Sequence, residues 1–98
     1  MHLDKLGKKH ITQLFTAMLK LEDVDECYSF FEDLCTVNEV KSLAQRFEVA
    51  KMLKKGYTYN KIEEATGAST ATISRVKRCL DYGEGGYNLI IDRLEKEE

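Results

Sequence analysis

Apolar residues recur three and four positions apart along the whole chain, and none of its 98 residues is proline. This spacing places apolar side chains on one face of an α-helix, whereas a half-buried β-strand would alternate them with polar ones. Proline disrupts helix interiors, so its absence leaves every apolar segment free to be helical. The sequence therefore predicts an all-α fold of six helices, in a single domain that covers residues 1–98.

Local signals predict where these helices begin and end. Asp23 with Glu26, and Thr36 with Glu39, have the spacing of a capping box at a helix N-terminus. The third helix is expected to end at residues 54–56, Lys-Lys-Gly, because cations favour the helix C-terminus and glycine can adopt the left-handed cap. The predicted buried faces are, in chain order, Ile11, Leu14, Phe15, Met18 and Leu19; Val24, Cys27, Tyr28, Phe31 and Leu34; Val40, Leu43, Ala44, Phe47, Ala50 and Leu53; Ile62 and Ala65; Ile73, Val76 and Leu80; and Tyr87, Ile90, Ile91 and Leu94.

Two of the predicted helices are short and lie close together in the sequence. The first spans about residues 60–66, and the second runs from Ser69 or Thr70, as its cap, to about Leu80. Only the three residues Gly-Ala-Ser join them. Two short helices joined by such a turn form the helix-turn-helix unit, whose second helix enters the major groove of DNA. We therefore predict a helix-turn-helix over about residues 60–80.

The middle of the chain is basic, although the formal net charge of the whole chain is −2. Residues 41–80 hold nine Lys or Arg against three Asp or Glu, whereas residues 1–40 hold four against eight and residues 81–98 hold two against six. A basic block of this kind is typical of a surface that binds a polyanion. Solvated helix faces are the alternative explanation.

The second helix of the predicted unit begins with small and polar residues and continues with cations. Small side chains let the helix approach base edges, and their hydroxyl and methyl groups can contact bases. Cations further along, and polar residues of the preceding helix, are expected to contact phosphates. A helical hairpin with capping hydroxyls and solvated cations is the alternative. The candidate base-reading residues are Ser69, Thr70, Ala71 and Ser74, and the candidate phosphate-binding residues are Asn60, Lys61, Arg75, Lys77 and Arg78.

Other classes of function lack a signal in this sequence. No apolar run approaches the roughly 18 residues that span a bilayer, and the N-terminus lacks the apolar segment of a signal peptide, so we expect a cytoplasmic protein with no membrane partner. Cys27, Cys35 and Cys79 form no C-x-x-C pair, which predicts reduced, mostly buried thiols and no metal site. Without a nucleophile–base arrangement or a phosphate-binding glycine loop, we expect neither an enzyme nor a cofactor.

The segment from Leu34 to Leu80 resembles the bacterial Trp repressor family, and in particular its branch of YerC/YecD-type proteins. The similarity lies in the threonine-capped third helix, in Arg46 ten residues after that cap, in the Gly-Ala turn and in the sequence ATISR at residues 71–75. The resemblance implies an intertwined homodimer, in which the outer helices of two chains interlock and two helix-turn-helix units project from a shared core. It also implies transcription regulation, as a repressor, at a palindromic operator with half-sites about 34 Å apart.

The resemblance also implies a ligand site, at which two residues depart from the family pattern. In the Trp repressor, tryptophan lies between two arginines, which correspond to Arg46 and Arg75, and faces a threonine, which corresponds to Thr72. The glycine that packs against the indole is Val76 here, and the serine that meets the polar end of the amino acid is Cys79. A valine in a slot that requires no side chain leaves no room for an aromatic ring. We therefore predict that tryptophan is not the corepressor.

Five alternatives remain open at this point. The two arginines could pair with carboxylates or contact phosphate instead of holding a ligand. The protein could bind DNA with no small molecule, or it could sense a smaller or different effector. Cys79, which has three cations near it in the sequence, could act as a redox-sensing thiol, although a buried and unreactive cysteine is the simpler interpretation. A dimer that binds an acidic protein partner instead of DNA would keep the same fold and the same basic surface.

Overall fold

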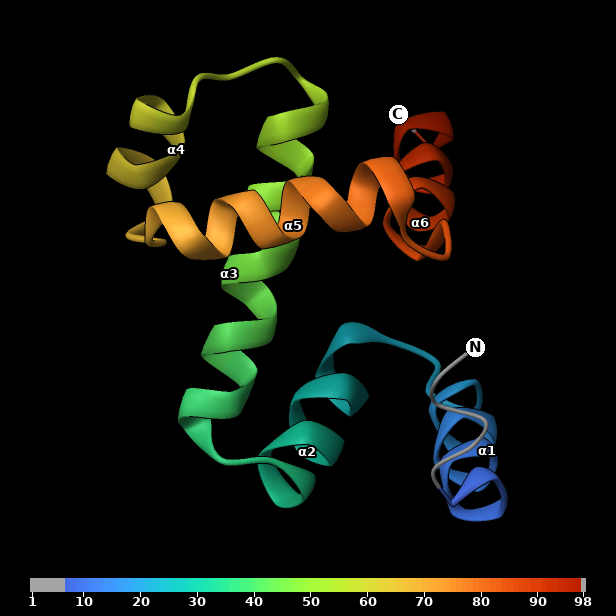
Figure 1. Ribbon diagram of the computed structural model, residues 1–98. Coiled ribbons are helices and arrows are strands. Elements are labelled where there is room, and N and C mark those ends of the chain that lie inside the picture. The colour runs from blue at the N-terminus through green and yellow to red at the C-terminus, as the bar shows by residue number, and fades with distance from the viewer. Residues whose placement is uncertain (1–6, 98) are drawn as a thin grey trace. The chain divides into compact units, whose positions relative to one another are not determined.

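The computed structural model describes residues 7–97, in which six α-helices and no strand are found (Figure 1). The predicted all-α class and the predicted number of helices are confirmed. Contacts between residues divide the chain into two compact units, of which the first ends at Val37 and the second begins at Asn38. The helices are α1 (Lys8–Met18), α2 (Val24–Leu34), α3 (Val37–Lys54), α4 (Tyr59–Thr66), α5 (Thr70–Tyr82) and α6 (Gly86–Lys96).

The first unit holds α1 and α2. A carboxylate oxygen of Asp23 accepts a hydrogen bond from the backbone N–H of Glu26 at 2.8 Å, as the capping-box spacing predicts. The Glu26 carboxylate reaches one residue further back than that pattern requires and accepts from the backbone N–H of Glu22 at 2.9 Å. These two hydrogen bonds define the N-terminus of helix α2. Further along the same helix, the rings of Phe30 and Phe31 meet edge to face, with their centroids 5.6 Å apart.

The predicted buried faces of α1 and α2 are not enclosed within a single chain. No residue of either helix is fully buried, and Leu19, directly after α1, is 85% exposed. Each helix has only 11 residues, and a helix this short depends on packing of its apolar face for stability. The other large apolar residues of these two faces that remain exposed are Phe15, Val24, Tyr28 and Leu34.

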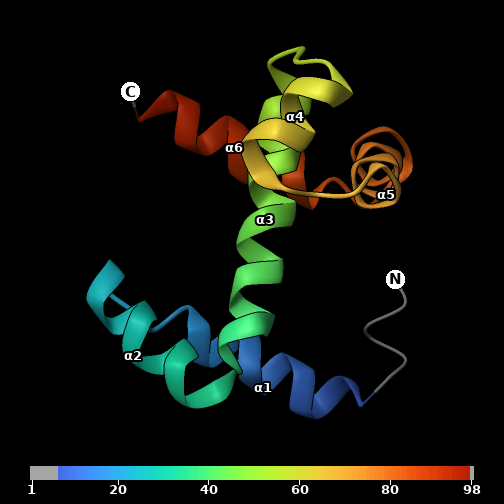
Figure 2. The same cartoon turned by 90° about the vertical axis from the view of Figure 1, so that its left-hand side faces the viewer.

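The second unit has a small core to which all four of its helices contribute. Helix α5 crosses α3, with α4 beside its N-terminal end and α6 beside its C-terminal end (Figures 1 and 2). Partly buried residues, including Phe47, Leu53, Leu80 and Tyr87, pack around the core. The buried core residues are Val49 and Ala50 of α3, Ile62 of α4, Ala68 of the turn, Ile73 and Val76 of α5, and Ile91 of α6.

The buried face of α3 differs from the predicted one. Val49 is fully buried although the predicted face omits it, because it belongs to the core cluster to which α4, α5 and α6 also contribute. Val40, Leu43 and Ala44, in the N-terminal half, are exposed. Ala65 of α4 is also exposed, since the short helix turns only Ile62 into the core. On α6, Ile91 is buried, whereas Ile90 and Leu94, both expected to be buried, remain exposed.

The helix ends lie close to their predicted positions. Helix α3 ends at Lys54, and Gly56 adopts a left-handed φ of 87°. Helix α4 begins one residue earlier than expected, because the Thr58 hydroxyl caps it and accepts from the backbone N–H of Lys61 at 3.3 Å. Helix α5 continues two residues beyond the predicted end at Leu80, to Tyr82.

Candidate nucleic-acid interface

The turn between α4 and α5 has the predicted three residues and is held rigidly. Gly67 adopts a left-handed φ of 71°, and its N–H donates to the Glu63 carbonyl at 2.9 Å. The Thr66 hydroxyl donates to the Ile62 carbonyl at 2.7 Å and accepts from the backbone N–H of Ala68 at 3.1 Å. Ala68 itself is buried in the core. The angle between the two helices is thus set by buried and hydrogen-bonded groups.

A hydrogen bond from helix α3 also holds this turn. The side-chain amide of Gln45 donates to the Thr66 carbonyl at 3.0 Å, and both residues are half-buried. A carbonyl at the C-terminus of α4, which has no partner within the helix, is satisfied in this way. The turn is therefore attached to the long helix through a polar contact as well as through the core.

The N-terminus of α5 presents the four predicted base-reading residues, all of them exposed. Ser69 is the helix cap, and its hydroxyl accepts from the backbone N–H of Thr72 at 3.1 Å. The hydroxyl of Thr70, the first residue of α5, donates to the Glu63 carboxylate at 2.6 Å. Ala71 and Ser74 follow on the exposed surface of the helix.

The predicted phosphate-binding residues are also exposed, on α5 and α4. Asn60 and Lys61 lie in the first turn of α4, and Arg75 and Arg78 lie on α5. Lys77 forms an ion pair with Asp81, one turn further along α5. The hydrogen bond that Lys77 donates to Asp81, and then the negative charge of Asp81, raise the pKa of Lys77 above the usual 10.5, so Lys77 is cationic at neutral pH. The helix thus offers a cationic segment after its small N-terminal residues.

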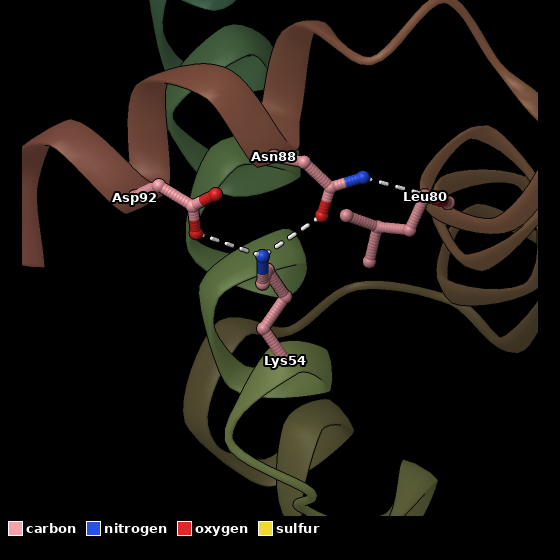
Figure 3. A network of polar contacts seen from close by, with 4 residues as sticks. All are labelled: Lys54, Leu80, Asn88 and Asp92. Carbon is pink, nitrogen blue, oxygen red and sulfur yellow. Dashed lines mark hydrogen bonds and ion pairs between the residues drawn. The ribbon is translucent and has the colours of Figure 1, made fainter.

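Polar contacts from α3 and α6 hold the C-terminal end of α5 (Figure 3). The side-chain amide of Asn88 donates to the Leu80 carbonyl at 3.2 Å and accepts from the Lys54 ammonium at 2.8 Å. The same ammonium lies 3.3 Å from a carboxylate oxygen of Asp92. The Leu80 carbonyl belongs to the last turn of α5, where carbonyl groups lack helical partners. Both ends of α5 are therefore tied to the rest of the second unit.

The residues of the predicted ligand site have different environments. Val76 is 2% exposed and packs in the core, as its position on the apolar face predicts. Arg46 and Thr72 are half-buried, and the Thr72 hydroxyl lies 3.1 Å from the Ser69 hydroxyl. Among residues 7–97, neither Arg46 nor Arg75 forms an ion pair with a carboxylate.

Cys79 is exposed, which contradicts the expectation of a buried thiol. Its position on α5 is one turn after Arg75 rather than on the apolar face that contains Val76, so no neighbouring helix covers it. Cys27 and Cys35 are half-buried and also unpaired. No group of three or more His, Cys, Asp or Glu within residues 7–97 is arranged to hold a metal ion. None of the helices in this range is both long and apolar enough to cross a membrane.

Comparison with known proteins identifies the family. The sequence profile of the family described as "Trp repressor protein" matches residues 9–95. The chain belongs to the Trp repressor family. The uncharacterized protein YerC of Bacillus subtilis (strain 168) is 60% identical over 98 residues, which are 100% of this chain and 94% of YerC. The family resemblance predicted from the segment between Leu34 and Leu80 is thus confirmed over nearly the whole chain.

Two solved structures of this family resemble the chain closely. The crystal structure of a candidate Trp repressor from Staphylococcus aureus is 57% identical and has a TM-score of 0.93, covering 97% of this chain and 95% of that one. A TrpR-like protein from Eubacterium eligens ATCC 27750 is 59% identical with a TM-score of 0.90, covering 94% and 95% of the two chains. The Trp-repressor-like fold of this chain is therefore established.

Three polar residues next to the predicted interface are missing from the sequence-based set. Asp81 has a local signal, because acidic and basic residues four positions apart on a helix form ion pairs. Glu63 and Asn88 have none, since their partners Thr70 and Lys54 lie seven and 34 positions away in the sequence. Only the packing of α4 and α6 against their neighbours brings these pairs together.

Proposed function

We propose that this protein is a homodimeric transcription regulator of the cytoplasm that represses by binding a palindromic duplex-DNA operator and does not use tryptophan as corepressor. The observation that carries this proposal is the exposed surface of α5, on which small hydroxyl residues at the N-terminus precede Arg75, Lys77 and Arg78. Helix N-termini of this composition suit base edges in the major groove, and the following cations suit phosphates. This is the activity of a binding protein and not of an enzyme.

The rigid turn supports the same assignment. A recognition helix can discriminate between bases only if its angle to the supporting helix is maintained when it enters the groove. Contacts of Thr66, Ala68 and Gln45 hold the start of α5, and Asn88 holds its end. The binding surface is therefore preorganised, which reduces the entropic cost of association.

Burial of Val76 supports the exclusion of tryptophan. Its side chain contributes to the core together with Val49, Ile62 and Ile73. An indole ring in the family's ligand slot would have to displace a side chain that these residues already enclose, at a cost of about 1–3 kcal/mol or more. Val76 instead supports α5 from within, so that the helix keeps its position without a small molecule.

The proposed dimer is supported by the apolar residues that one chain leaves exposed. They include Val37 and Leu43 of α3 and Leu89 of α6, in addition to those of the first unit. Exposed apolar surface of this extent is typical of an interface between chains. Interlocking of the outer helices of two copies would bury these residues. Sedimentation equilibrium tests the dimer, and a mass of one chain at micromolar concentration would contradict it.

The decisive experiment is selection of bound sequences from genomic DNA fragments, with and without L-tryptophan, at physiological salt. We expect the same palindromic motif in both arms. A motif that is recovered only with tryptophan would show that the ligand slot survives the valine. Isothermal titration of the protein with L-tryptophan provides an independent measurement, and binding at micromolar affinity would contradict the proposal.

The absence of any motif in either arm would instead favour one of the other two possibilities, an unidentified effector or an acidic protein partner. The salt dependence of binding to duplex DNA separates them. Binding to phosphates releases counterions, so a DNA-binding protein that lacks its effector would still bind any duplex, and this binding would weaken steeply with salt. Such binding, together with displacement of a protein partner by any duplex, would argue against the acidic protein partner.

A further inference from the structure

The hydrogen bond between Thr70 and Glu63 connects the first residue of the recognition helix with the preceding helix. The Thr70 hydroxyl oxygen lies 2.6 Å from a carboxylate oxygen of Glu63. A hydroxyl group has one proton to donate, whereas an ionised carboxylate has none. The direction of this hydrogen bond is therefore fixed by chemistry, with Thr70 as the donor and Glu63 as the acceptor. The short distance is typical of a charge-assisted O–H···O⁻ hydrogen bond.

This hydrogen bond changes what Thr70 can offer to a base. Its only proton is engaged by Glu63, so the exposed side of the hydroxyl has lone pairs alone. Glu63 is half-buried, and the other lone pairs of its carboxylate are likewise acceptors. In the major groove, adenine and cytosine present amino groups that donate, whereas guanine and thymine present carbonyl oxygens that accept.

We propose that Glu63 is a specificity-determining residue, which makes Thr70 an obligate acceptor and so selects adenine or cytosine at the base that Thr70 contacts. The inference rests on the proposed function, because it assigns the chemistry of one contact in the same interface. Glu63 also fulfils a structural role, since a carboxylate near the N-terminus of α5 is favoured by the helix dipole. The experiment must therefore separate base preference from stability.

The test compares selected DNA motifs of the wild-type protein and three variants, Thr70→Val, Glu63→Gln and Glu64→Gln. Thr70→Val keeps the shape of the side chain and removes the hydroxyl, so it identifies the base position that Thr70 contacts. Glu63→Gln keeps the size of the residue and replaces a group that can only accept by an amide, which accepts through its oxygen or donates through its NH2 group. Glu64→Gln is the matched control, because it removes the same charge from the neighbouring, exposed position of α4. Thermal melting of each variant verifies that it is folded.

At the position identified by Thr70→Val, we expect the wild-type protein to prefer adenine or cytosine over guanine or thymine by about tenfold. Glu63→Gln should weaken this preference at the same position, because the amide can also donate to Thr70, and the hydroxyl proton is then free to point toward the base. Glu64→Gln should leave the motif unchanged and raise the affinity for all sequences alike, as expected when a carboxylate near phosphates is neutralised.

Three results would overturn the inference while the proposed function stands. The first is a guanine or thymine at the Thr70 position in the wild-type motif. The second is a motif that Thr70→Val leaves unchanged. The third is a Glu63→Gln variant that behaves like Glu64→Gln, with uniformly higher affinity and the same motif. If the wild-type protein selects no motif and also shows no salt-dependent binding to duplex DNA, the proposed function itself is wrong, and the inference is overturned with it.

Discussion

The ammonium group of Lys77 lies 3.0 Å from a carboxylate oxygen of Asp81, one turn further along α5. Lys77 is one of the residues predicted to bind phosphate, so in the free protein a neighbouring carboxylate already occupies one of its three donors. Both side chains are nearly half exposed, and an ion pair of this kind contributes little to stability. Its effect is therefore expected in DNA binding.

We predict that Asp81→Asn raises the affinity for DNA. The substitution removes a negative charge that competes with phosphate for Lys77. The slope of the logarithm of the DNA-binding constant against the logarithm of the salt concentration should become steeper, by about one unit for each additional phosphate that the protein neutralises. Fluorescence anisotropy with labelled duplex over a range of salt concentrations measures both quantities. An unchanged slope would indicate that Lys77 does not bind phosphate.

We expect Arg75→Ala to weaken binding to all DNA sequences and to flatten the salt dependence by about one unit for each phosphate that the protein no longer neutralises. The selected motif should stay the same, because the binding of a phosphate contains no sequence information. Arg93→Ala on α6 is a suitable control, since this arginine lies outside the helix-turn-helix. If Arg75→Ala changes the selected motif, the guanidinium group of Arg75 contacts a base in the wild-type protein.

The core position of Val76 predicts a large effect of its truncation on stability. Val76→Ala removes two buried methyl groups and leaves a cavity among Val49, Ile62 and Ile73. The free energy of unfolding should fall by about 2–3 kcal/mol, as measured by urea denaturation. Ser74→Ala, an exposed position of the same helix, should change it by less than about 0.5 kcal/mol. Similar values for the two variants would contradict the role of Val76 as a core residue.

Asn88 connects α6 with the ends of α3 and α5 (Figure 3). Asn88→Ala should lower the free energy of unfolding by about 1–2 kcal/mol, because the half-buried Leu80 carbonyl loses its side-chain donor and Lys54 loses an acceptor. Asp92→Asn keeps the shape of its side chain and alters only the exposed contact with Lys54 at 3.3 Å, so we expect a change of less than about 1 kcal/mol. Thermal melting compares the two, and an equal loss would contradict the assigned role of Asn88.

The helices and the helix-turn-helix were predictable because their signals act over a few residues. Spacing of apolar residues, the Asp23 and Ser69 caps and the left-handed Gly67 each involve neighbours within one helical turn. The residues proposed for the interface follow from the same local signals, since Asn60 and Lys61 lie in the first turn of α4 and the others lie at the cap or along the exposed surface of α5. Their identity as base or phosphate contacts stays a prediction. The expected burial of Cys79 was wrong, because burial depends on which neighbouring helix covers a given face.

By itself, the sequence determined the all-α class, the three-residue turn, the cationic segment of α5 and membership of the Trp repressor family. Only the tertiary structure decided that Val49 is buried, that Thr70 donates its proton to Glu63, and that Asn88 meets Lys54 from 34 positions away. The physical reason is the distance along the sequence over which each interaction acts. Caps and helical spacing are local, whereas burial and the partners of a hydroxyl or an ammonium group depend on how separate helices pack.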